Sequence, residues 1–191
     1  MSAQLQPKLT PEEYLALERQ ATCKSEYYNG EIFAMAGASR RHNLINIAIS
    51  SFLYAKFRKT PCDVYSNDMR VKIETVGLYT YPDVVIVCDP PLFDDEHKDT
   101  LLNPNVIIEV LSDSTEDYDR GTKFKMYRTL TSLTDYLLVS QNSYNVEHYV
   151  KQSAHQWHLT EYQNLTDSIT FSTIDCELKL ADIYEKVNIT E

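Results

Sequence analysis

The sequence lacks any apolar run that approaches the ~20 residues of a membrane-spanning helix. Its N-terminus also lacks the apolar core of a signal peptide, so we expect a cytoplasmic protein with no membrane partner. No Cys-x-x-Cys pair is present, which argues against a zinc site. Reduced thiols that fill small spaces in the core are the better expectation for the four scattered cysteines, Cys23, Cys62, Cys88 and Cys176.

Positive charge is also scarce, because 18 lysines and arginines face 28 acidic residues and leave a net charge of −10. This balance argues against broad, non-specific binding to nucleic acid. No helix-turn-helix, zinc-finger or RNA-binding signature supplies base recognition either. Two small basic clusters leave room for a local basic groove, although exposed charges on two helices explain them equally well. The clusters are Lys56, Arg58 and Lys59, and Arg120, Lys123, Lys125 and Arg128.

The first part of the chain carries clear helix and hairpin signals. At 191 residues it is long enough for one domain, residues 1–191, with a substantial core. A Thr-Pro-Glu-Glu start predicts a helix from Pro11 to about Ala21. The pair Asn29-Gly30 lies between strand-forming residues and predicts a β-hairpin. Apolar residues at helical spacing predict a second helix over 40–59.

The rest of the chain is mostly strand-like. Strands are expected over 62–74, 83–88 and 105–111, and a third helix over about 117–130. A β-meander then follows, and a short segment near 178–184 closes the chain; the meander strands are Tyr136–Ser140, Tyr144–Val150 and Gln156–Tyr162. This order of elements predicts an α/β fold of the α+β type with a mixed sheet.

Glu109 is the most unusual residue of the sequence. Residues 106–111 read Val-Ile-Ile-Glu-Val-Leu, a run without a solvated face that is typical of a central strand covered on both sides. An unpaired ionised carboxyl there would be very costly, so Glu109 should have a cation, a metal or a proton. Strand alternation places Glu109 on one face with Ile107 and Leu111.

A second acid and a lysine accompany Glu109. Asp83 opens the apolar strand 83–88, and if the two strands are neighbours the carboxylates can converge on Mg²⁺, which needs only one or two of them. On the third helix, Lys123 shares a sheet-facing stripe with Arg120, Tyr127 and Leu130, whereas Lys125 lies about 200° around the axis. Lys123 is therefore the better partner. A purely structural ion pair, with Lys123, Arg120 or a tyrosine neutralising Glu109, stays open on these grounds.

Several short segments of the chain form a further pattern. They are Glu26-Tyr-Tyr-Asn-Gly-Glu-Ile, His42, Tyr81-Pro-Asp-Val, Asn103-Pro104 with Ile108-Glu-Val-Leu-Ser, and Asp119-Arg-Gly-Thr-Lys with Tyr127. In this order and spacing, these segments resemble the Uma2 family. That family, formerly a domain of unknown function, is assigned to the PD-(D/E)xK nuclease superfamily. The resemblance spans roughly residues 10–185. It implies a restriction-endonuclease-like core with an N-terminal helix and β-hairpin and a C-terminal β-meander.

The resemblance also implies roles for individual residues. Asp83 corresponds to the aspartate of the Pro-Asp half and Glu109 to the acid of the second half, and together they would bind Mg²⁺, with Mn²⁺ as a substitute. Leu111 stands where the superfamily has lysine, and Lys123 resembles the migrated replacement. His42 would join the catalytic residues from the second helix, although a helix cap explains it equally well. As a further catalytic acid, Glu26 fits the pattern of the family slightly better than Glu31. Both could equally be acids on the protein surface.

The implied activity is that of a Mg²⁺-dependent endonuclease that hydrolyses DNA phosphodiester bonds. Two other hypotheses stay open. In one, the fold is catalytically weak or inactive and binds nucleic acid or a protein partner. In the other, the chain is a dimeric interaction protein, for which its 14 tyrosines would suit an aromatic interface. We expect a homodimer in any of these cases, because most soluble oligomers are symmetric dimers.

Overall fold

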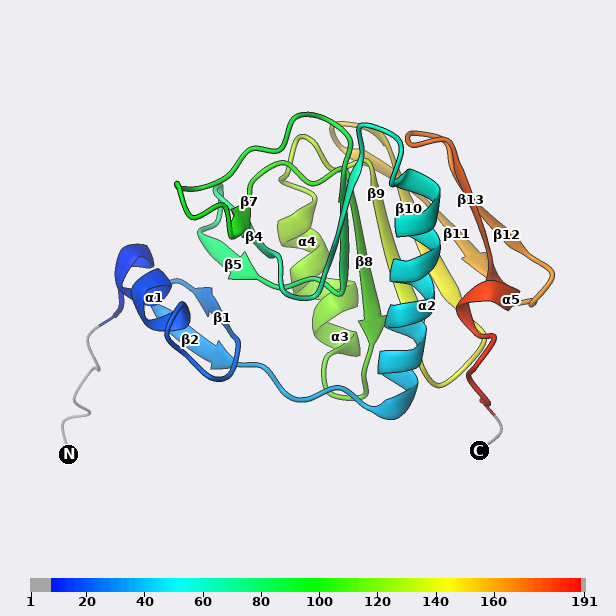
Figure 1. Cartoon of the computed structure of the whole chain (residues 1–191), viewed down its shortest axis with the longest axis horizontal. Coiled ribbons are helices and arrows are strands. Elements are labelled where there is room, and N and C mark those ends of the chain that lie inside the picture. Colours follow the sequence, from blue (N-terminus) through cyan, green and yellow to red (C-terminus); the bar gives the residue numbers. More distant parts are fainter. Residues whose placement is uncertain (1–7, 190–191) are drawn as a thin grey trace.

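The computed structural model describes residues 8–189 (Figure 1). The helices are α1 (Pro11–Glu18), α2 (Arg40–Phe57), α3 (Glu116–Tyr118), α4 (Phe124–Tyr127) and α5 (Leu180–Ile183). A π-helical turn, Asp119–Lys123, joins α3 to α4. The strands are β1 (Ser25–Tyr28), β2 (Glu31–Ala34), β3 (Asp63–Ser66), β4 (Arg70–Ile73), β5 (Leu78–Thr80), β6 (Val84–Val87), β7 (Thr100–Leu101), β8 (Val106–Leu111), β9 (Asp135–Ser140), β10 (Val146–Ser153), β11 (Gln156–Tyr162), β12 (Ser168–Phe171) and β13 (Cys176–Lys179).

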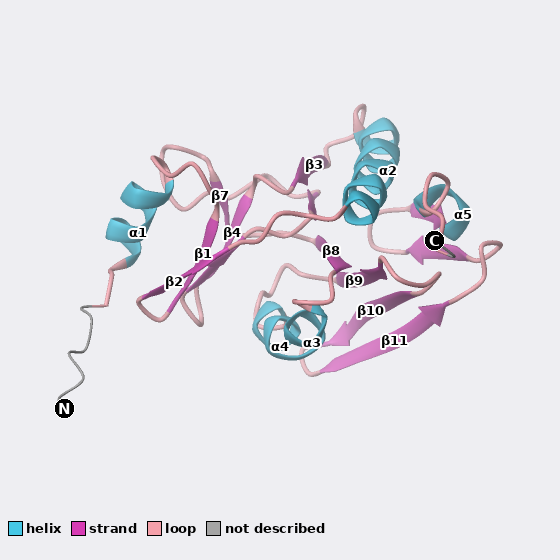
Figure 2. Ribbon diagram, turned by 90° about the horizontal axis from the view of Figure 1, so that it is seen from below, coloured by secondary structure: helices cyan, strands magenta, loops and turns pink. Residues whose placement is uncertain are grey.

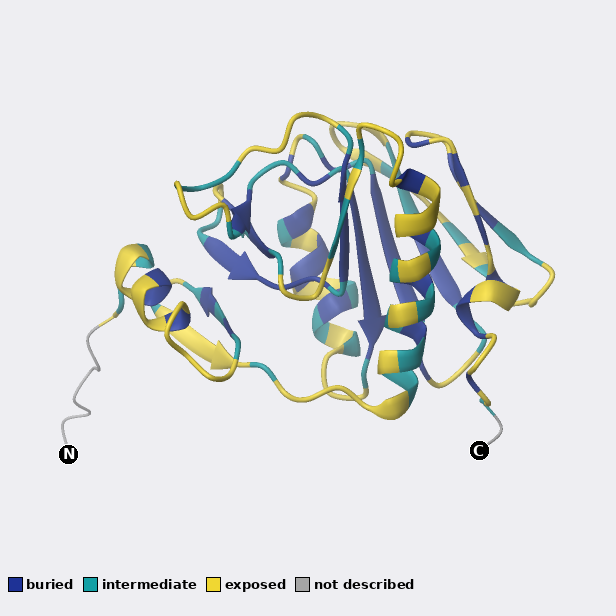
Figure 3. Cartoon of the chain, viewed as in Figure 1, coloured by how far each residue is buried: buried dark blue, intermediate teal, exposed yellow. Residues whose placement is uncertain are grey.

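A six-stranded mixed sheet of order β11-β10-β9-β8-β6-β3 forms the centre of the molecule. β8 and β9 run parallel, and the other neighbouring strands are antiparallel. Figure 2 shows α2 on one side of β8 and β9, and α3 with α4 on the other. Every residue of β8 is buried, as a central strand covered on both faces requires (Figure 3).

The alternation of β8 divides the core into two clusters. Val106, Ile108 and Val110 pack with the buried face of α2, whereas Ile107 and Leu111 pack with Phe124 and Tyr127 of α4. The predicted faces of this strand are therefore confirmed. Because Glu109 alternates with Val110, its side chain points to the side of α3 and α4.

A second sheet, of order β2-β1-β5-β4-β7, carries the N-terminal hairpin. Asn29 and Gly30 both have positive φ, 51° and 89°, as the tight turn between β1 and β2 requires. Tyr14 of α1 stacks on Tyr27 and contacts Tyr79, so α1 covers the outer face of this sheet. The opposite face carries Glu26, which alternates with Tyr27.

The predicted α+β fold is confirmed, with the C-terminal meander β9–β11 where it was expected, and the differences are local. α1 ends at Glu18 rather than near Ala21, and the third helix ends at Tyr127. The predicted strand 62–74 is two strands, separated by a turn at Asn67–Met69. The prediction omitted three short strands, β5, β7 and β12, and the closing segment is β13 followed by α5. Within residues 8–189, no helix is both long and apolar enough to cross a membrane.

The prediction of reduced cysteines is wrong for two of the four. Cys62 and Cys88 form a disulfide. Asp63 pairs with Val87 in the antiparallel β3–β6 ladder, so the residues just beyond this pair are brought opposite each other. That contact spans a sequence separation of 26 residues and is set by strand pairing, not by cysteine spacing. Cys176 is a buried free thiol, as expected, and Cys23 is free but exposed.

Two arginines clamp α1 and β4 to one carboxylate. Arg19 donates to both oxygens of Asp99, at 2.8 and 3.0 Å, and the Nη2 atom of buried Arg70 lies 3.0 Å from the Asp99 Oδ2 atom. The hydrogen bonds from Arg19 hold the pKa of Asp99 well below its usual range. This clamp ties the hairpin end of the molecule to the loop that carries β7.

Replacing Asp99 by asparagine is expected to lower the free energy of unfolding at pH 7 by about 1–2 kcal/mol, because the side chain is partly exposed and its charged hydrogen bonds are partly screened. A carboxyl with a depressed pKa stabilises the fold above its unfolded pKa, so this contribution should fade below about pH 4. Urea unfolding at pH 7 and pH 3 measures both effects. Asp68→Asn is the control, since Asp68 is 83% exposed; an equal loss in both variants would contradict the clamp.

Candidate active site

Adjacent strands bring the two predicted acids together. In the antiparallel β6–β8 ladder, Val84 lies opposite Ile108, which places Asp83, one residue earlier, opposite Glu109. The backbone N–H of Val110 donates to the Asp83 Oδ2 atom at 2.8 Å. Asp83 is thus held against the edge of β8 beside Glu109, and the condition that the two strands be neighbours is met.

Glu109 is buried and has two partners on one oxygen. Lys123 Nζ lies 3.0 Å from the Glu109 Oε1 atom, and the Tyr127 hydroxyl donates to the same atom at 2.9 Å. Burial raises the pKa of Glu109 to about 8, against the opposing effect of Lys123. Glu109 therefore keeps a strong affinity for a proton in the absence of another cation.

Lys123 lies at the centre of three carboxylates. Its Nζ atom is 3.0 Å from Glu109, 3.2 Å from Glu26 and 3.4 Å from Asp119. Burial alone would lower the pKa of Lys123, but the surrounding acidic groups, led by Glu109, raise it well above its ordinary value. The lysine is therefore charged, and Lys125, which is exposed, takes no part.

A π-helical turn determines how Lys123 is presented. The turn Asp119–Lys123 ends at this lysine. π-Turns are rare in proteins overall, but those that occur are frequently found at functional sites. Arg120, which the predicted stripe placed beside Lys123, instead pairs with Glu116 and Glu147. Arg120 therefore does not neutralise Glu109, which was one form of the purely structural alternative.

Glu26 reaches the site from the hairpin. Besides its contact with Lys123, its Oε1 atom accepts a hydrogen bond from the Thr80 hydroxyl on β5. Glu31 lies beside the hairpin turn, opposite Tyr28, and is exposed. Of the two glutamates considered, the structure brings Glu26 to Lys123.

Helix α2 supplies the partners of Asp83. His42 Nε2 lies 3.1 Å from the Asp83 Oδ2 atom, and Asn46, one helical turn later, donates to the Asp83 Oδ1 atom at 3.1 Å. The backbone N–H of His42 donates to Ser39, the cap of the helix. The cap is therefore Ser39, and the His42 ring is free to face the acid.

Sequence reasoning missed three residues of this site as participants. Thr80 and Asn46 are ordinary polar residues, and no local pattern distinguishes them. Asp119 could have been found, because it precedes Lys123 by four residues and so lies on the same side of a helix. It is 3% exposed, burial raises its pKa, and within residues 8–189 its Oδ1 atom has no hydrogen-bond partner apart from the long 3.4 Å ion pair with Lys123.

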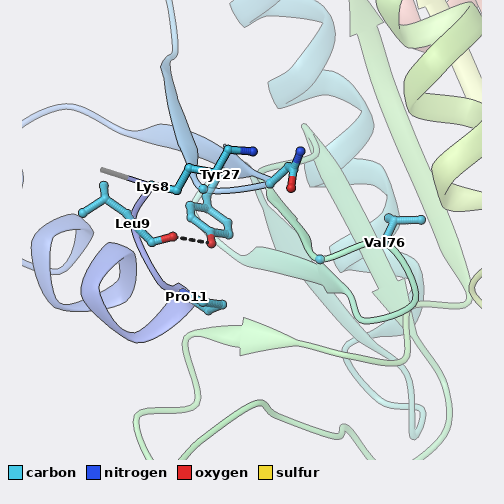
Figure 4. A pocket seen from close by; sticks show the side chains of 8 residues that line it. Lys8, Leu9, Pro11, Tyr27 and Val76 are labelled. Atoms are coloured by element: carbon cyan, nitrogen blue, oxygen red, sulfur yellow. Dashed lines mark hydrogen bonds between the residues drawn. The ribbon is translucent and has the colours of Figure 1, made fainter. Parts of the chain in front are cut away.

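A pocket of about 340 Å³ lies away from this site. It is bounded by the segment before α1, the hairpin turn and the turn at Val76–Gly77 (Figure 4). Tyr27 lines it and donates a hydrogen bond to the carbonyl of Leu9. Since Tyr27 and Glu26 point to opposite faces of the hairpin, this pocket is separate from the acidic site.

Comparisons with known proteins identify the fold and the family. A solved structure from Anabaena variabilis ATCC 29413, described as "a putative nuclease belonging to DUF820", superposes with a TM-score of 0.74. It is 16% identical, and the match covers 93% of this chain and 98% of that one, which establishes the shared α+β fold.

The family model that matches the chain is Uma2, described as "Putative restriction endonuclease", over residues 11–181. The chain belongs to the Uma2 family. Two relatives come from Synechocystis sp. (strain PCC 6803). "Uncharacterized protein sll1609" is 42% identical over 164 residues, covering 86% of this chain and 93% of that protein. "Uncharacterized protein slr1290" is 36% identical over 178 residues, covering 93% and 92%.

Proposed function

We propose that the protein is a Mg²⁺-dependent endonuclease that hydrolyses DNA phosphodiester bonds at the site formed by Asp83, Glu109 and Lys123. The observation that carries the proposal is the register of β6 and β8, which sets residues 83 and 109 opposite each other on neighbouring strands, with the buried ammonium of Lys123 beside Glu109. Membership of a family described as "Putative restriction endonuclease" supports it.

The donor set suits a hard cation. Glu26 and Asp119 already face the single charge of Lys123, so an ionised Glu109 would give the cluster an excess of negative charge that a cation would balance. Within the described residues, no three or more acidic, histidine or cysteine side chains converge closely enough to hold a metal ion. In this proposal Asp83 and Glu109 would provide two ligands, and water and phosphate the others, which is the usual coordination of Mg²⁺.

A bound Mg²⁺ would polarise a phosphoryl oxygen and lower the pKa of a coordinated water. The ammonium of Lys123 is placed to stabilise negative charge that develops on the phosphate, and its position is fixed by Glu26 and Asp119. His42 and the N–H of Val110 fix the orientation of Asp83. Glu109 must release its proton to bind a cation, so binding should release protons below about pH 8.

The test is a cleavage assay with purified protein on circular, linear and single-stranded DNA. EDTA should stop cleavage, and added Mg²⁺ or Mn²⁺ should restore it. Glu109→Gln keeps the shape of the side chain but removes the anion, so this variant should be inactive with either metal while it remains folded by circular dichroism. A wild-type preparation that cuts none of these substrates with either metal would overturn the proposal, as would a Glu109→Gln variant that cuts at the wild-type rate.

A further inference from the structure

Strand β2 presents an aromatic ring beside the candidate active site that the proposed chemistry does not use. All four residues of β2 are exposed, and it is the edge strand of its sheet (Figure 3). Phe33 pairs with Glu26 across the hairpin and is 49% exposed. Directly opposite residues share a face with their Cβ atoms roughly 5 Å apart, so the ring of Phe33 lies on the same face as Glu26 and Lys123.

Two arginines lie between Phe33 and His42 in the chain. Arg40 and Arg41 begin α2, immediately before His42, whose ring contacts Asp83. Within residues 8–189 neither arginine forms an ion pair, a side-chain hydrogen bond or a ring contact. Cations in the first turn of a helix oppose its dipole, so helix stability gives no reason for them.

We propose that the segment from Phe33 to Arg41 binds single-stranded DNA, with an unpaired base stacked on Phe33 and neighbouring phosphates on Arg40 and Arg41. This inference rests on the proposed nuclease function and adds the form of the substrate. Proteins that hold single strands combine cationic groups along the backbone with aromatic rings that stack on bases. A base within a duplex has no free face, so Phe33 selects DNA that is unpaired at the point of cleavage.

The other occupant of an exposed edge strand would be a second copy of the chain. The position of the ring favours the nucleic acid. Phe33 pairs with Glu26 across the hairpin, whereas two other exposed apolar residues, Leu17 and Ile47, lie on helices α1 and α2. Within residues 8–189, Arg40 and Arg41 have no ion-pair partner, so both are available to bind an anion. DNA offers phosphates continuously along its backbone.

The experiment measures binding, separately from cleavage. The probe is a short single-stranded oligonucleotide with a central 2-aminopurine, compared with the same strand annealed to its complement, both in EDTA. Wild-type protein should prefer the single strand and quench the fluorescence. Phe33→Ala should weaken single-strand binding by about 5- to 150-fold, the cost of one lost stack, and abolish the quench without weakening duplex binding. Phe33→Tyr should behave as wild type, and so should the control Leu17→Ala.

The arginines give a second, independent readout. Replacing Arg40 and Arg41 together by glutamine should reduce the dependence of single-strand affinity on salt by a slope of about 1.4, from two lost phosphate contacts. Wild-type affinity and quench in Phe33→Ala would overturn the inference even if the protein cuts DNA. Sedimentation that shows a wild-type dimer and a Phe33→Ala monomer, with unchanged oligonucleotide binding, would assign β2 to a second copy instead. Phe33-dependent binding by a protein that cuts nothing would reject the nuclease and keep the strand-binding surface.

Discussion

Asp83→Asn is expected to reduce metal-dependent DNA cleavage by about a hundred- to a thousandfold while the protein stays folded. Metal ions supply several kcal/mol of charge stabilisation in the transition state, and each 1.36 kcal/mol is a factor of ten in rate. The asparagine oxygen can still accept the hydrogen bond from the N–H of Val110, so the local backbone is preserved. The expected loss is therefore a loss of cation binding, measured as the cleavage rate and, by calorimetry, as Mg²⁺ affinity.

Asp89→Asn is the matched control for this variant. Asp89 lies shortly after the other end of β6, is exposed, and has one long hydrogen bond, at 3.3 Å from Asn105. The same chemical change just beyond the opposite end of β6 should leave cleavage within about twofold, as for most surface substitutions. An Asp83→Asn preparation that is equally folded and cuts plasmid DNA as fast as wild type would refute the assignment of Asp83 as a ligand.

The central strand could be predicted from its composition because a run that is apolar except for Glu109 has few alternatives. The faces of β8 followed from the period of two, which is fixed by backbone geometry. The choice of Lys123 over Lys125 rested on an ideal helical period. It was correct for Lys123, which contacts Glu109, and Arg120 also reaches the sheet, where it pairs with Glu147 of β10.

Contacts between segments far apart in sequence could not be predicted from local patterns. The pairing of β3 with β6 is one example. Because this pairing could not be predicted, the disulfide between Cys62 and Cys88 could not be predicted either. The position of Thr80 against Glu26 is another, since it depends on the pairing of β1 with β5. Short strands such as β7, with two residues, carry too little periodicity to be recognised.

Lys123→Met is expected to lower the free energy of unfolding by about 3–5 kcal/mol, because removing one partner of a buried ionic cluster leaves uncompensated charge. Methionine fills a similar volume, so a cavity contributes little. For a chain of this size that loss corresponds to a fall in Tm of roughly 6–20 °C. Thermal unfolding followed by circular dichroism measures it, and the exposed Lys125→Met, two residues along, should stay within about 0.5 kcal/mol of wild type.

Glu109→Gln should lower the free energy of unfolding much less than Lys123→Met does. Such a difference identifies a cluster with more acids than its one lysine can balance. With the pKa of Glu109 near 8, the folded protein keeps a proton that the unfolded chain releases above about pH 4.5. The contribution of Glu109 to stability is therefore fully present below pH 4.5 and is lost as the pH rises to 8. Glutamine resembles the protonated carboxyl, so the difference in stability between wild type and Glu109→Gln should shift in favour of the variant across that range. If both substitutions cost the same at pH 7, with no pH-dependent difference, the cluster is a balanced ion pair rather than one with an excess of acids.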